Sequence, residues 1–462
     1  MEAINYIENK YPLPFKLRED QVNSINELAP LQRAGFYYDV GLGKTVLGIY
    51  SALYKIETEM VKHVICLMPP VLITNWSRNI ARIPGTTHVC YRGTPAQRDQ
   101  LDLNVQFILM SYQIFKKDWE KLAGQFHIGE VCLICDEAKA IKNVGSDTYK
   151  KVRDFASGNN IVLLEGTPIN HPLDGYAYVK TLGPTIYSTL YQFEQVHVKS
   201  RDFFNKPTEF RNLDLLAENI RYNAVRLLKR DVIKDMPPVT YNEIIYDLNP
   251  KHLKLYQKIV AEQIAALPDD TKIDLTHASS LLHACCQLPC NAEHFSGGDV
   301  ESTGLELLDE IMEELDGAKL IVFTVYRMTN KRLTDYCQKY GAVSIYGETA
   351  AKERQANLDR FTDDPSCRMI ILQVRAAGAG IDGLQNVCSD VLFLELPYTP
   401  GEFHQAVGRA DRVGQTQPVN VRIALAAKTV QSRVWDLVQE KDSLVNVCIR
   451  GQQDLKNYFM GA

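Results

Sequence analysis

The sequence lacks the features that mark membrane and secreted proteins. No apolar run reaches the roughly 20 residues that a membrane-spanning helix needs, and the apolar stretch at residues 61–71 is short and holds two prolines. Residues 1–10 are polar and carry no apolar signal-peptide core. The eleven cysteines are scattered through apolar runs, as free buried thiols would be, for example Cys66, Cys132, Cys135 and Cys388. We therefore expect a cytoplasmic protein that has no contact with a membrane.

The chain also lacks a strong charge of one sign, low-complexity tracts and short repeats. Its formal net charge is −5, which argues mildly against nonspecific binding to nucleic acid. A local basic groove can still lie on an acidic protein, so composition neither supports nor excludes DNA. The length of 462 residues suggests two or three domains with cores of their own.

Short apolar runs alternate with helical patterns, which predicts an α/β fold with parallel sheets. Buried parallel strands are continuous apolar runs, and the candidate strands have this character. They are residues 63–68, 106–110, 131–135, 161–164, 319–323, 369–372 and 391–394.

The alternation stops between Asn170 and Ala318, where helical patterns dominate. Apolar residues recur at helical spacing in residues 213–230 and 251–267, which predicts two helices. The prolines in residues 235–239 indicate a linker.

A glycine-rich segment suited to phosphate follows the apolar run at residues 35–38. In Gly41, Leu42, Gly43, Lys44 and Thr45, the glycines allow backbone N–H groups to wrap a phosphate, and a helical pattern follows. Lys44 would reach the terminal phosphates and Thr45 would ligate Mg²⁺. The strict pattern has a further glycine where Tyr38 stands, and a purely structural turn is the alternative.

An acidic pair ends the predicted strand at residues 131–135. Asp136 can hold Mg²⁺ through its water shell, and Glu137 can position and deprotonate an attacking water. A surface charge pair on a turn is the alternative, and the upstream phosphate loop makes it the weaker one.

Two arginines stand far downstream, within residues 405–415. Arg409 and Arg412 are three residues apart, so they would share one face of a helix. Such a pair suits the charge that develops on a γ-phosphate during transfer. A solvated basic face is the alternative, although the small neighbours Gly408, Ala410 and Gly414 favour close packing.

Taken together, these segments resemble the Swi/Snf-type ATPases of helicase superfamily two. The resemblance covers nearly the whole chain in the family's order, and it is specific because of that order. It is carried by residues 17–21, 39–45, 66–76, 110–112, 136–143, 164–169 and 227–238, by Tyr346 and Gly347 with Arg354 and Phe361, and by residues 375–381 and 405–415. Lys139, Glu165 and Asp411 depart from the residues usual in the family.

The resemblance implies two RecA-like parallel-sheet lobes with helical protrusions between them. Residues 1–235 would form the first, ATP-binding lobe with a protrusion, and residues 236–462 the second lobe with a helical insertion and the arginine motif. A long helical connection would be unusual in a minimal helicase, whereas the Swi/Snf type uses it for its protrusions.

The resemblance also assigns roles to residues. Lys44, Glu137, Arg409 and Arg412 would be catalytic, and Thr45 and Asp136 would hold Mg²⁺. ATP would contact Gln21, Gly41, Leu42, Gly43, Lys44, Thr45, Asp136 and Gly380. DNA would contact Trp76, Tyr112, Lys142 and Arg375, although core packing is an equal expectation for the two aromatic residues.

The function expected from these residues is a monomeric, ATP-driven DNA motor. The compact chain shows no chromatin-reading module, so we expect a relative of phage or bacterial enzymes that migrates branches or remodels forks. One alternative is a double-strand translocase that displaces bound proteins such as RNA polymerase without separating strands. A degenerate ATPase that clamps DNA and an RNA helicase are weaker alternatives.

One further cluster invites a zinc interpretation: His283, Cys285, Cys286, Cys290 and His294. The spacing lacks a C-x-x-C knuckle, so the core of a helix is the favoured interpretation.

Overall fold

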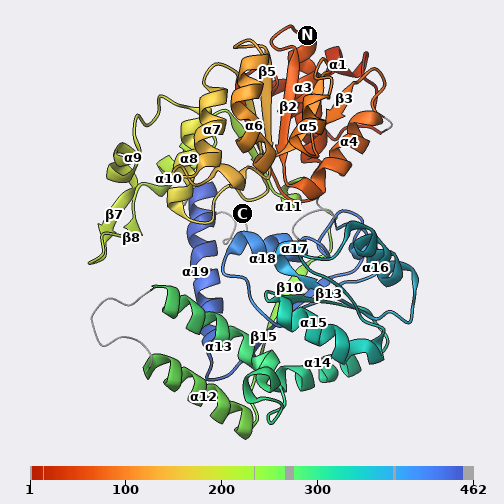
Figure 1. Ribbon diagram of the computed structural model, residues 1–462, viewed down its shortest axis with the longest axis vertical. Helices are drawn as coiled ribbons and strands as arrows, with labels where there is room; N and C mark the ends of the chain where they lie inside the picture. The colour runs from red at the N-terminus through yellow and green to blue at the C-terminus, as the bar shows by residue number, and fades with distance from the viewer. Residues whose placement is uncertain (1–2, 14, 234, 266–274, 378–380, 451–462) are drawn as a thin grey trace. The chain divides into compact units, whose positions relative to one another are not determined.

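The structure is a computed structural model that describes residues 3–13, 15–233, 235–265, 275–377 and 381–450. The chain forms two compact units, Met1–Lys234 with Asp442–Ala462, and Asp235–Lys441. Each unit is built on its own parallel sheet with helices around it (Figure 1). The expectation of two parallel-sheet α/β lobes is therefore confirmed, and the boundary expected after residue 235 stays a prediction.

The sheet of the first unit has seven parallel strands in the order β3-β4-β2-β5-β6-β1-β9. The strands are β1 (Arg33–Tyr38), β2 (His63–Met68), β3 (His88–Cys90), β4 (Phe107–Ser111), β5 (Val131–Asp136), β6 (Asn160–Leu164) and β9 (Ala224–Leu227). β2, β4, β5 and β6 confirm the four strands predicted for this unit. Because β5, β6 and β1 are neighbours and parallel, the loops that leave their carboxyl ends meet at one edge.

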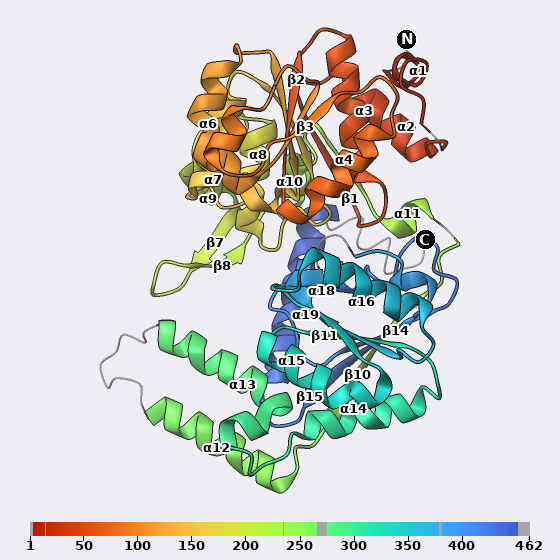
Figure 2. The same ribbon diagram turned by 45° about the vertical axis from the view of Figure 1, so that its right-hand side comes forward.

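Helices cover both faces of this sheet (Figures 1 and 2). Side chains alternate along β1: Tyr37 packs in one core with α6, α7 and α8, and Phe36 packs in the other with α1 to α4. The helices are α1 (Ala3–Glu8), α2 (Glu19–Leu28), α3 (Lys44–Glu57), α4 (Ile73–Ala81), α5 (Pro95–Asp99), α6 (Tyr112–Gln125), α7 (Asp147–Ala156), α8 (Gly175–Leu182), α9 (Leu190–His197), α10 (Leu213–Ile220) and α11 (Lys229–Val232).

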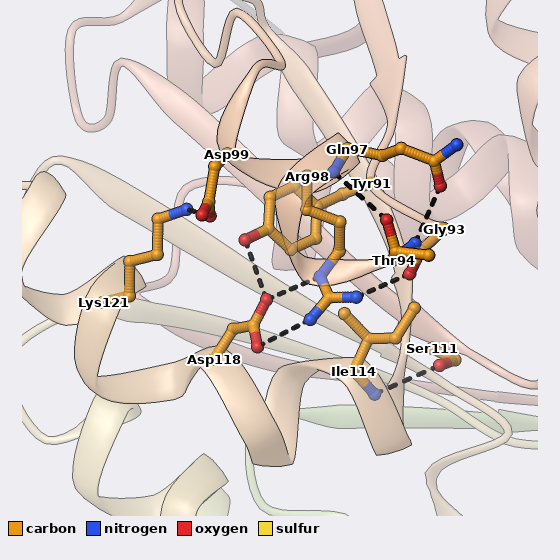
Figure 3. A network of polar contacts seen from close by, with 10 residues as sticks. All are labelled: Tyr91, Gly93, Thr94, Gln97, Arg98, Asp99, Ser111, Ile114, Asp118 and Lys121. Carbon is orange, nitrogen blue, oxygen red and sulfur yellow. Dashed lines mark hydrogen bonds and ion pairs between the residues drawn. The ribbon is translucent and has the colours of Figure 1, made fainter.

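A polar network fixes α6 against the short helix α5 (Figure 3). The Arg98 guanidinium donates to both carboxylate oxygens of Asp118, at 2.7 and 3.0 Å, and Tyr91 Oη donates to the same carboxylate at 2.9 Å. Ser111 caps the first turn of α6 by accepting the N–H of Ile114 at 3.2 Å. These contacts hold the start of α6, where Tyr112 approaches the predicted acidic site.

The helix predicted at residues 213–230 is wrong beyond Ile220. α10 ends there, Asn223 takes a left-handed φ of 54°, and β9 then pairs parallel with β1. The edge of the sheet offers β9 a row of backbone partners, and this tertiary pairing outweighs the helical spacing of the apolar residues. A two-stranded antiparallel hairpin, β7 (Val198–Arg201) and β8 (Pro207–Phe210), also interrupts the region expected to be helical.

The second unit has six parallel strands in the order β10-β15-β14-β11-β13-β12. They are β10 (Val239–Tyr246), β11 (Leu320–Thr324), β12 (Val343–Ile345), β13 (Met369–Gln373), β14 (Asp390–Phe393) and β15 (Val419–Ala426). β11, β13 and β14 confirm the strands predicted for this unit. Leu320 and Ile321 of β11 face opposite cores, so this sheet is also covered on both sides.

The helices of the second unit include the one predicted at residues 251–267, which appears as α12 over its described part. They are α12 (Pro250–Ala265), α13 (Leu275–Ser296), α14 (Thr303–Glu314), α15 (Arg327–Tyr336), α16 (Ala351–Asp363), α17 (Val374–Ala377), α18 (Pro400–Val407) and the part of α19 (Val430–Arg450) up to Lys441, since the rest of α19 belongs to the first unit. In the part of the chain that the structure describes, no helix is long and apolar enough to cross a membrane.

Most of the described cysteines are buried thiols. Cys66, Cys132, Cys135 and Cys388 are free and buried, as the sequence predicts. Cys285, Cys286 and Cys290 lie on α13 and pack in hydrophobic cores of the second unit. Among the described residues, no group of three or more His, Cys, Asp or Glu side chains is placed to hold a metal ion.

Candidate ATP site

The glycine-rich segment forms a turn between β1 and α3. Gly41 and Gly43 take φ values of 89° and 85°, and Gly43 caps α3 without a side-chain hydrogen bond. These left-handed conformations favour glycine, and they leave the N-terminus of α3 open to an anion. Lys44 Nζ donates to the carbonyl oxygen of Tyr38 at 2.7 Å and to that of Asp39 at 3.3 Å. The lysine expected to hold phosphates therefore lies inside the loop.

Gln21 lies directly on this loop. Its Nε2 donates to Leu42 O at 3.0 Å, and the Arg18 guanidinium donates to the same oxygen at 3.0 Å. A Cβ atom on Gly43 would fall 2.6 Å from Gln21 Nε2. Thus a residue placed at the nucleotide by resemblance alone is in contact with the phosphate loop, and Gly43 is needed for that approach.

Asp136 ends β5 in a buried setting that two aromatic residues define. Trp76 Nε1 donates to Asp136 Oδ2 at 2.7 Å, and Tyr112 Oη donates to the Asp136 main-chain oxygen at 2.9 Å. The Trp76 side chain is 0% exposed and Tyr112 is also buried. Of the two expectations for these rings, DNA contact and core packing, their burial favours core packing, and each gives its polar group to Asp136, because an indole N–H and a phenol need polar partners in a core.

Burial, reinforced by the neighbouring charge of Glu137, raises the pKa of Asp136 from 3.8 to about 7. The hydrogen bond from Trp76 and the positive charge of Lys44 oppose this shift. A bound cation would favour the ionised form of this carboxylate. The buried carboxylate at the end of β5 therefore fits a hard cation such as magnesium, which prefers oxygen ligands.

Glu137 adopts a left-handed backbone with φ 52°, which is rare for a residue with a side chain. Its carbonyl oxygen accepts the N–H of Ala140 at 3.1 Å, and its carboxylate pairs with Lys139 at 3.1 Å. Strain of this kind costs on the order of 1–3 kcal/mol and persists where the surroundings impose it, commonly at functional sites. The charge of Glu137 acts on Lys44, Asp136 and Glu165, so its side chain lies close to all three.

Glu165 joins the loops that follow β5 and β6. Its carboxylate accepts the N–H of Lys139 at 2.7 Å, of Gly166 at 2.8 Å and of Thr167 at 3.2 Å. Burial, together with the charge of Glu137, raises the pKa of Glu165 above its ordinary value. A glutamate at this position can thus hold two loops in one arrangement. The threonine or serine usual in the resembled family has a shorter side chain, which could not reach both loops in this way.

Lys44 is the positive centre of this cluster. Burial lowers the pKa of Lys44, while Glu137, Asp136, Glu165 and Asp39 all favour its charged form. The structure therefore brings together Lys44, Asp136 and Glu137, which the sequence separates by about 90 residues of chain, and it adds Asp39 and Glu165.

Arg226 of β9 is a contributor that the sequence did not reveal. It donates to the carbonyl oxygens of Tyr37 at 2.8 Å and Gly166 at 2.7 Å, and it pairs with Asp39 at 3.1 Å. Burial would raise the pKa of Asp39, but the charge of Arg226 and the N–H of Lys229 hold it below its ordinary value. The only available signal was an arginine within a short apolar run, which is too common to point to a site.

In the second unit, Arg409 and Arg412 follow the end of α18 at Val407, so the prediction that they share a helix face is wrong. They lie in the turns that follow Gly408, yet they still converge: each donates to the carbonyl oxygen of Ile381, at 2.8 and 3.2 Å. Arg409 is 5% exposed, which excludes a solvated basic face for it. Gly380 lies outside the described residues.

The two expected phosphate-binding cations lie near the surface. In the first unit, Lys142 is partly exposed and pairs with Asp174 at 3.2 Å. In the second unit, the Arg375 side chain is 78% exposed and pairs with Glu402 at 3.1 Å. Surface pairs of this kind contribute little to stability, so either cation can exchange its carboxylate for a phosphate at low cost.

Comparison with known proteins agrees with this geometry. The model of the SNF2-related domain matches residues 35–294, and that of the helicase conserved C-terminal domain matches residues 303–414. The chain belongs to the SNF2-related family. It is therefore an ATPase of the helicase type, with Swi/Snf-like architecture.

The relatives of this SNF2-related ATPase include proteins from bacteria and animals. An uncharacterised ATP-dependent helicase of Mycoplasma pneumoniae is 25% identical over 423 residues, covering 88% of this chain and 39% of that protein. The mouse SWI/SNF-related matrix-associated actin-dependent regulator of chromatin subfamily A member 1 is 27% identical over 476 residues, covering 94% and 43%. The chain thus spans about two fifths of the length of these curated relatives.

A solved structure, the Sulfolobus solfataricus SWI2/SNF2 ATPase core in complex with dsDNA, is similar at 22% identity. The match covers 96% of this chain and 95% of that one, with a TM-score of 0.45.

Proposed function

We propose that this SNF2-type ATPase is a DNA-dependent motor that remodels forked or branched DNA, as in branch migration during replication, recombination or repair. The observation that carries the proposal is the cluster at the carboxyl ends of β1, β5 and β6. There a lysine lies inside a phosphate-type loop, Asp136 ends β5 and Glu137 follows it. Such a cluster suits hydrolysis of a nucleoside triphosphate.

Each residue of the cluster has a proposed task. Lys44 and the N–H groups of the glycine loop bind the phosphates, and Thr45 and Asp136 hold Mg²⁺, which would neutralise phosphate charge when bound. Glu137 orients the attacking water and takes its proton. Gln21 contacts the nucleotide beside the loop. Arg409 and Arg412 stabilise the charge that develops on the γ-phosphate, and Gly380, of the segment at residues 375–381, contacts the nucleotide.

Binding of DNA is proposed through its phosphates. Lys142 and Arg375 are the assigned contacts, since both cations are accessible and charge-assisted bonds to phosphate are independent of base sequence. We propose that the motor acts as a monomer.

The test is a steady-state ATPase assay run in parallel without nucleic acid and with single strands, closed circular duplex, forks, four-way junctions and RNA. We expect low turnover alone and the strongest stimulation by forks and junctions. Equal stimulation by closed duplex would instead support a double-strand translocase that displaces bound proteins. Equal stimulation by RNA would reject DNA as the substrate, and DNA binding without ATP turnover would indicate a clamp.

A further inference from the structure

The β7–β8 hairpin of the first unit presents two phenylalanines to solvent. β7 and β8 pair antiparallel, and residues 202–206 form the turn between them. Phe203 is 96% exposed and Phe204 is 73% exposed. Their ring centroids are 5.5 Å apart with the planes at 86°. Two adjacent aromatic rings left in water at a tip indicate a surface that binds something.

The turn that carries these rings is held by its own polar groups. Asp202 Oδ1 accepts the N–H of Phe204 at 2.9 Å and of Lys206 at 2.8 Å. Main-chain bonds from Asp202 to Lys206 and from Asn205 to Asp202, each 2.9 Å, close the turn, and Asn205 takes φ 62°. A tip ordered in this way loses little conformational entropy when it binds.

The hairpin is also fixed to the body of the unit. Arg201 donates to Asn205 O at 2.9 Å and pairs with Glu194 of α9 at 3.0 Å. His197, where α9 meets β7, is fully buried and shares a hydrogen bond of 2.6 Å with Tyr187. The hairpin projects away from the main sheet beside α9 (Figures 1 and 2). The two rings thus stand on a supported base.

Charge indicates the kind of partner. The hairpin, residues 198–210, carries three basic residues, Lys199, Arg201 and Lys206, against two acidic ones, and Arg211 follows it directly, while the whole chain has a net charge of −5. One of the two acids, Asp202, uses its carboxylate to close the turn. A basic, aromatic-tipped element on an acidic protein fits a polyanion with flat apolar faces, which is nucleic acid with accessible bases.

We propose that the Phe203–Phe204 tip stacks on bases that are exposed where a DNA duplex opens or branches. This inference rests on the proposed function and names the feature of the substrate that the protein recognises. Inside a continuous duplex each base is already stacked on its neighbours, so the tip has no face to contact there. Phenylalanine offers no hydrogen-bond donor or acceptor, so the recognition is of structure and not of base sequence.

Substitutions at the tip separate stacking from simple apolar contact. Phe203→Leu/Phe204→Leu keeps apolar bulk without an aromatic face, whereas Phe203→Tyr/Phe204→Tyr keeps the face. Affinity without nucleotide is measured by fluorescence anisotropy on a fork with single-stranded arms, with closed circular duplex as a competitor. We expect the Leu pair to lose roughly tenfold on the fork and little on the circle, and the Tyr pair to retain affinity. Ile128→Ala, an exposed apolar residue on another loop of the unit, is the matched control.

Asp202 provides a second test in which two explanations predict opposite signs. Asp202→Asn and Asp202→Ala both remove a negative charge, but only Asn keeps an acceptor oxygen for the turn. If the tip acts through its order, Asp202→Ala weakens binding to the fork and Asp202→Asn does not. If only charge matters, both variants bind every DNA more tightly, and the proposal is overturned.

The remaining outcomes are also decisive. Stacking is overturned if the Leu pair loses affinity equally for fork and circle, or if it keeps its affinity for both. Kept affinity would point to a protein surface as the partner. Failure of the proposed function looks different, because the wild-type ATPase would then respond to no DNA, or to forks and junctions no better than to closed duplex. ATPase stimulated by closed duplex should be the same in wild type and Leu pair, which shows that the variant is folded.

Discussion

The indole N–H of Trp76 donates a 2.7 Å hydrogen bond to the carboxylate of Asp136, and both side chains are buried. Trp76 belongs to α4 and Asp136 ends β5, so a residue from a segment assigned to DNA contact sets the electrostatics of the ATP site. A conformational shift of α4 would be felt at Asp136 directly. This bond is a physical link by which a ligand near α4 could change the affinity of the site for its cation.

Trp76→Phe should move the acid limb of activity to higher pH. The hydrogen bond lowers the pKa of Asp136, which burial has raised to about 7, so its loss raises that pKa further. If the ionised carboxylate is required, kcat/KM for ATP decreases as the pH is lowered, and this decrease begins at a higher pH in the variant than in wild type. Tyr112→Phe is the matched control, since its hydroxyl bonds to the main-chain oxygen of Asp136. An unshifted limb in Trp76→Phe would reject the link.

Asp136→Asn should stabilise the nucleotide-free protein more at pH 8 than at pH 5. A carboxyl whose pKa rises from 3.8 to about 7 on folding keeps its proton in the folded state where the unfolded chain has lost it. The free energy of unfolding of the wild-type protein therefore falls as pH rises between these values, by on the order of 1–4 kcal/mol. The asparagine variant has no carboxyl group to titrate here, so it does not lose this stability. Thermal unfolding at the two pH values measures the effect. A Tm difference between variant and wild type that is the same at both would contradict it.

Lys44→Ala and Glu137→Gln should both abolish turnover by different routes. Removing Lys44 deletes the positive centre of the acidic cluster and should weaken ATP binding. Removing the charge of Glu137 deletes the base but leaves the loop intact, so ATP should still bind. Nucleotide affinity by calorimetry beside single-turnover hydrolysis separates the two. An active Glu137→Gln enzyme would end the assignment of Glu137 as the base.

The strands whose runs are continuously apolar, such as β5 and β11, could be predicted from the sequence because both of their faces are buried. β15 could not, although it lies within its sheet. It contains Asn420 and Arg422, and Arg422 is buried only because it pairs with Asp390 at 2.5 Å and Glu314 at 2.9 Å. A charge whose partners are distant in sequence looks like a surface charge until the fold is known.

The site shows the same limit. The sequence could predict Lys44, Asp136 and Glu137 because each belongs to a short sequence motif that itself indicates the chemistry. Arg226 was not, since its role depends on β9 pairing with β1. Trp76 was assigned to a motif, but DNA contact and core packing both stayed open for it, because sequence order does not say which way a side chain faces.

Glu165→Ala should uncouple DNA from hydrolysis more than it slows basal turnover. Its carboxylate joins the loops after β5 and β6 through backbone N–H groups, including that of Lys139. Without this contact, DNA bound at one loop has less effect on the position of the other loop. Stimulation of the ATPase by DNA should therefore fall by roughly 5- to 150-fold, the usual range of coupling between sites. Lys139→Ala is the matched control because it keeps the backbone N–H. ATPase with and without saturating DNA gives the ratio; an equal fall in both rates would show that Glu165 is merely structural.

Arg412→Ala should cut ATP hydrolysis by ~10³-fold while changing ATP affinity much less, since an arginine that acts on the γ-phosphate during transfer strengthens its contact in the transition state. Arg412 is a cleaner test than Arg409, whose burial at 5% exposure makes a folding defect the expected result of its removal. Arg412 pairs with Asp382 at 3.3 Å and donates to Ile381 O. Asp382→Ala is therefore the matched control, because it breaks the pair, leaves the guanidinium in place and should keep turnover near that of wild type.

Turnover and nucleotide-free DNA affinity are measured together for both Arg412→Ala and Asp382→Ala. DNA binding without nucleotide should survive in Arg412→Ala, because Lys142 and Arg375 are untouched. Normal turnover with weakened DNA binding would reassign Arg412 from catalysis to DNA contact. Loss of turnover in both variants would instead show that the pair with Asp382 shapes the turns after α18, and that the catalytic role belongs to the arrangement as a whole.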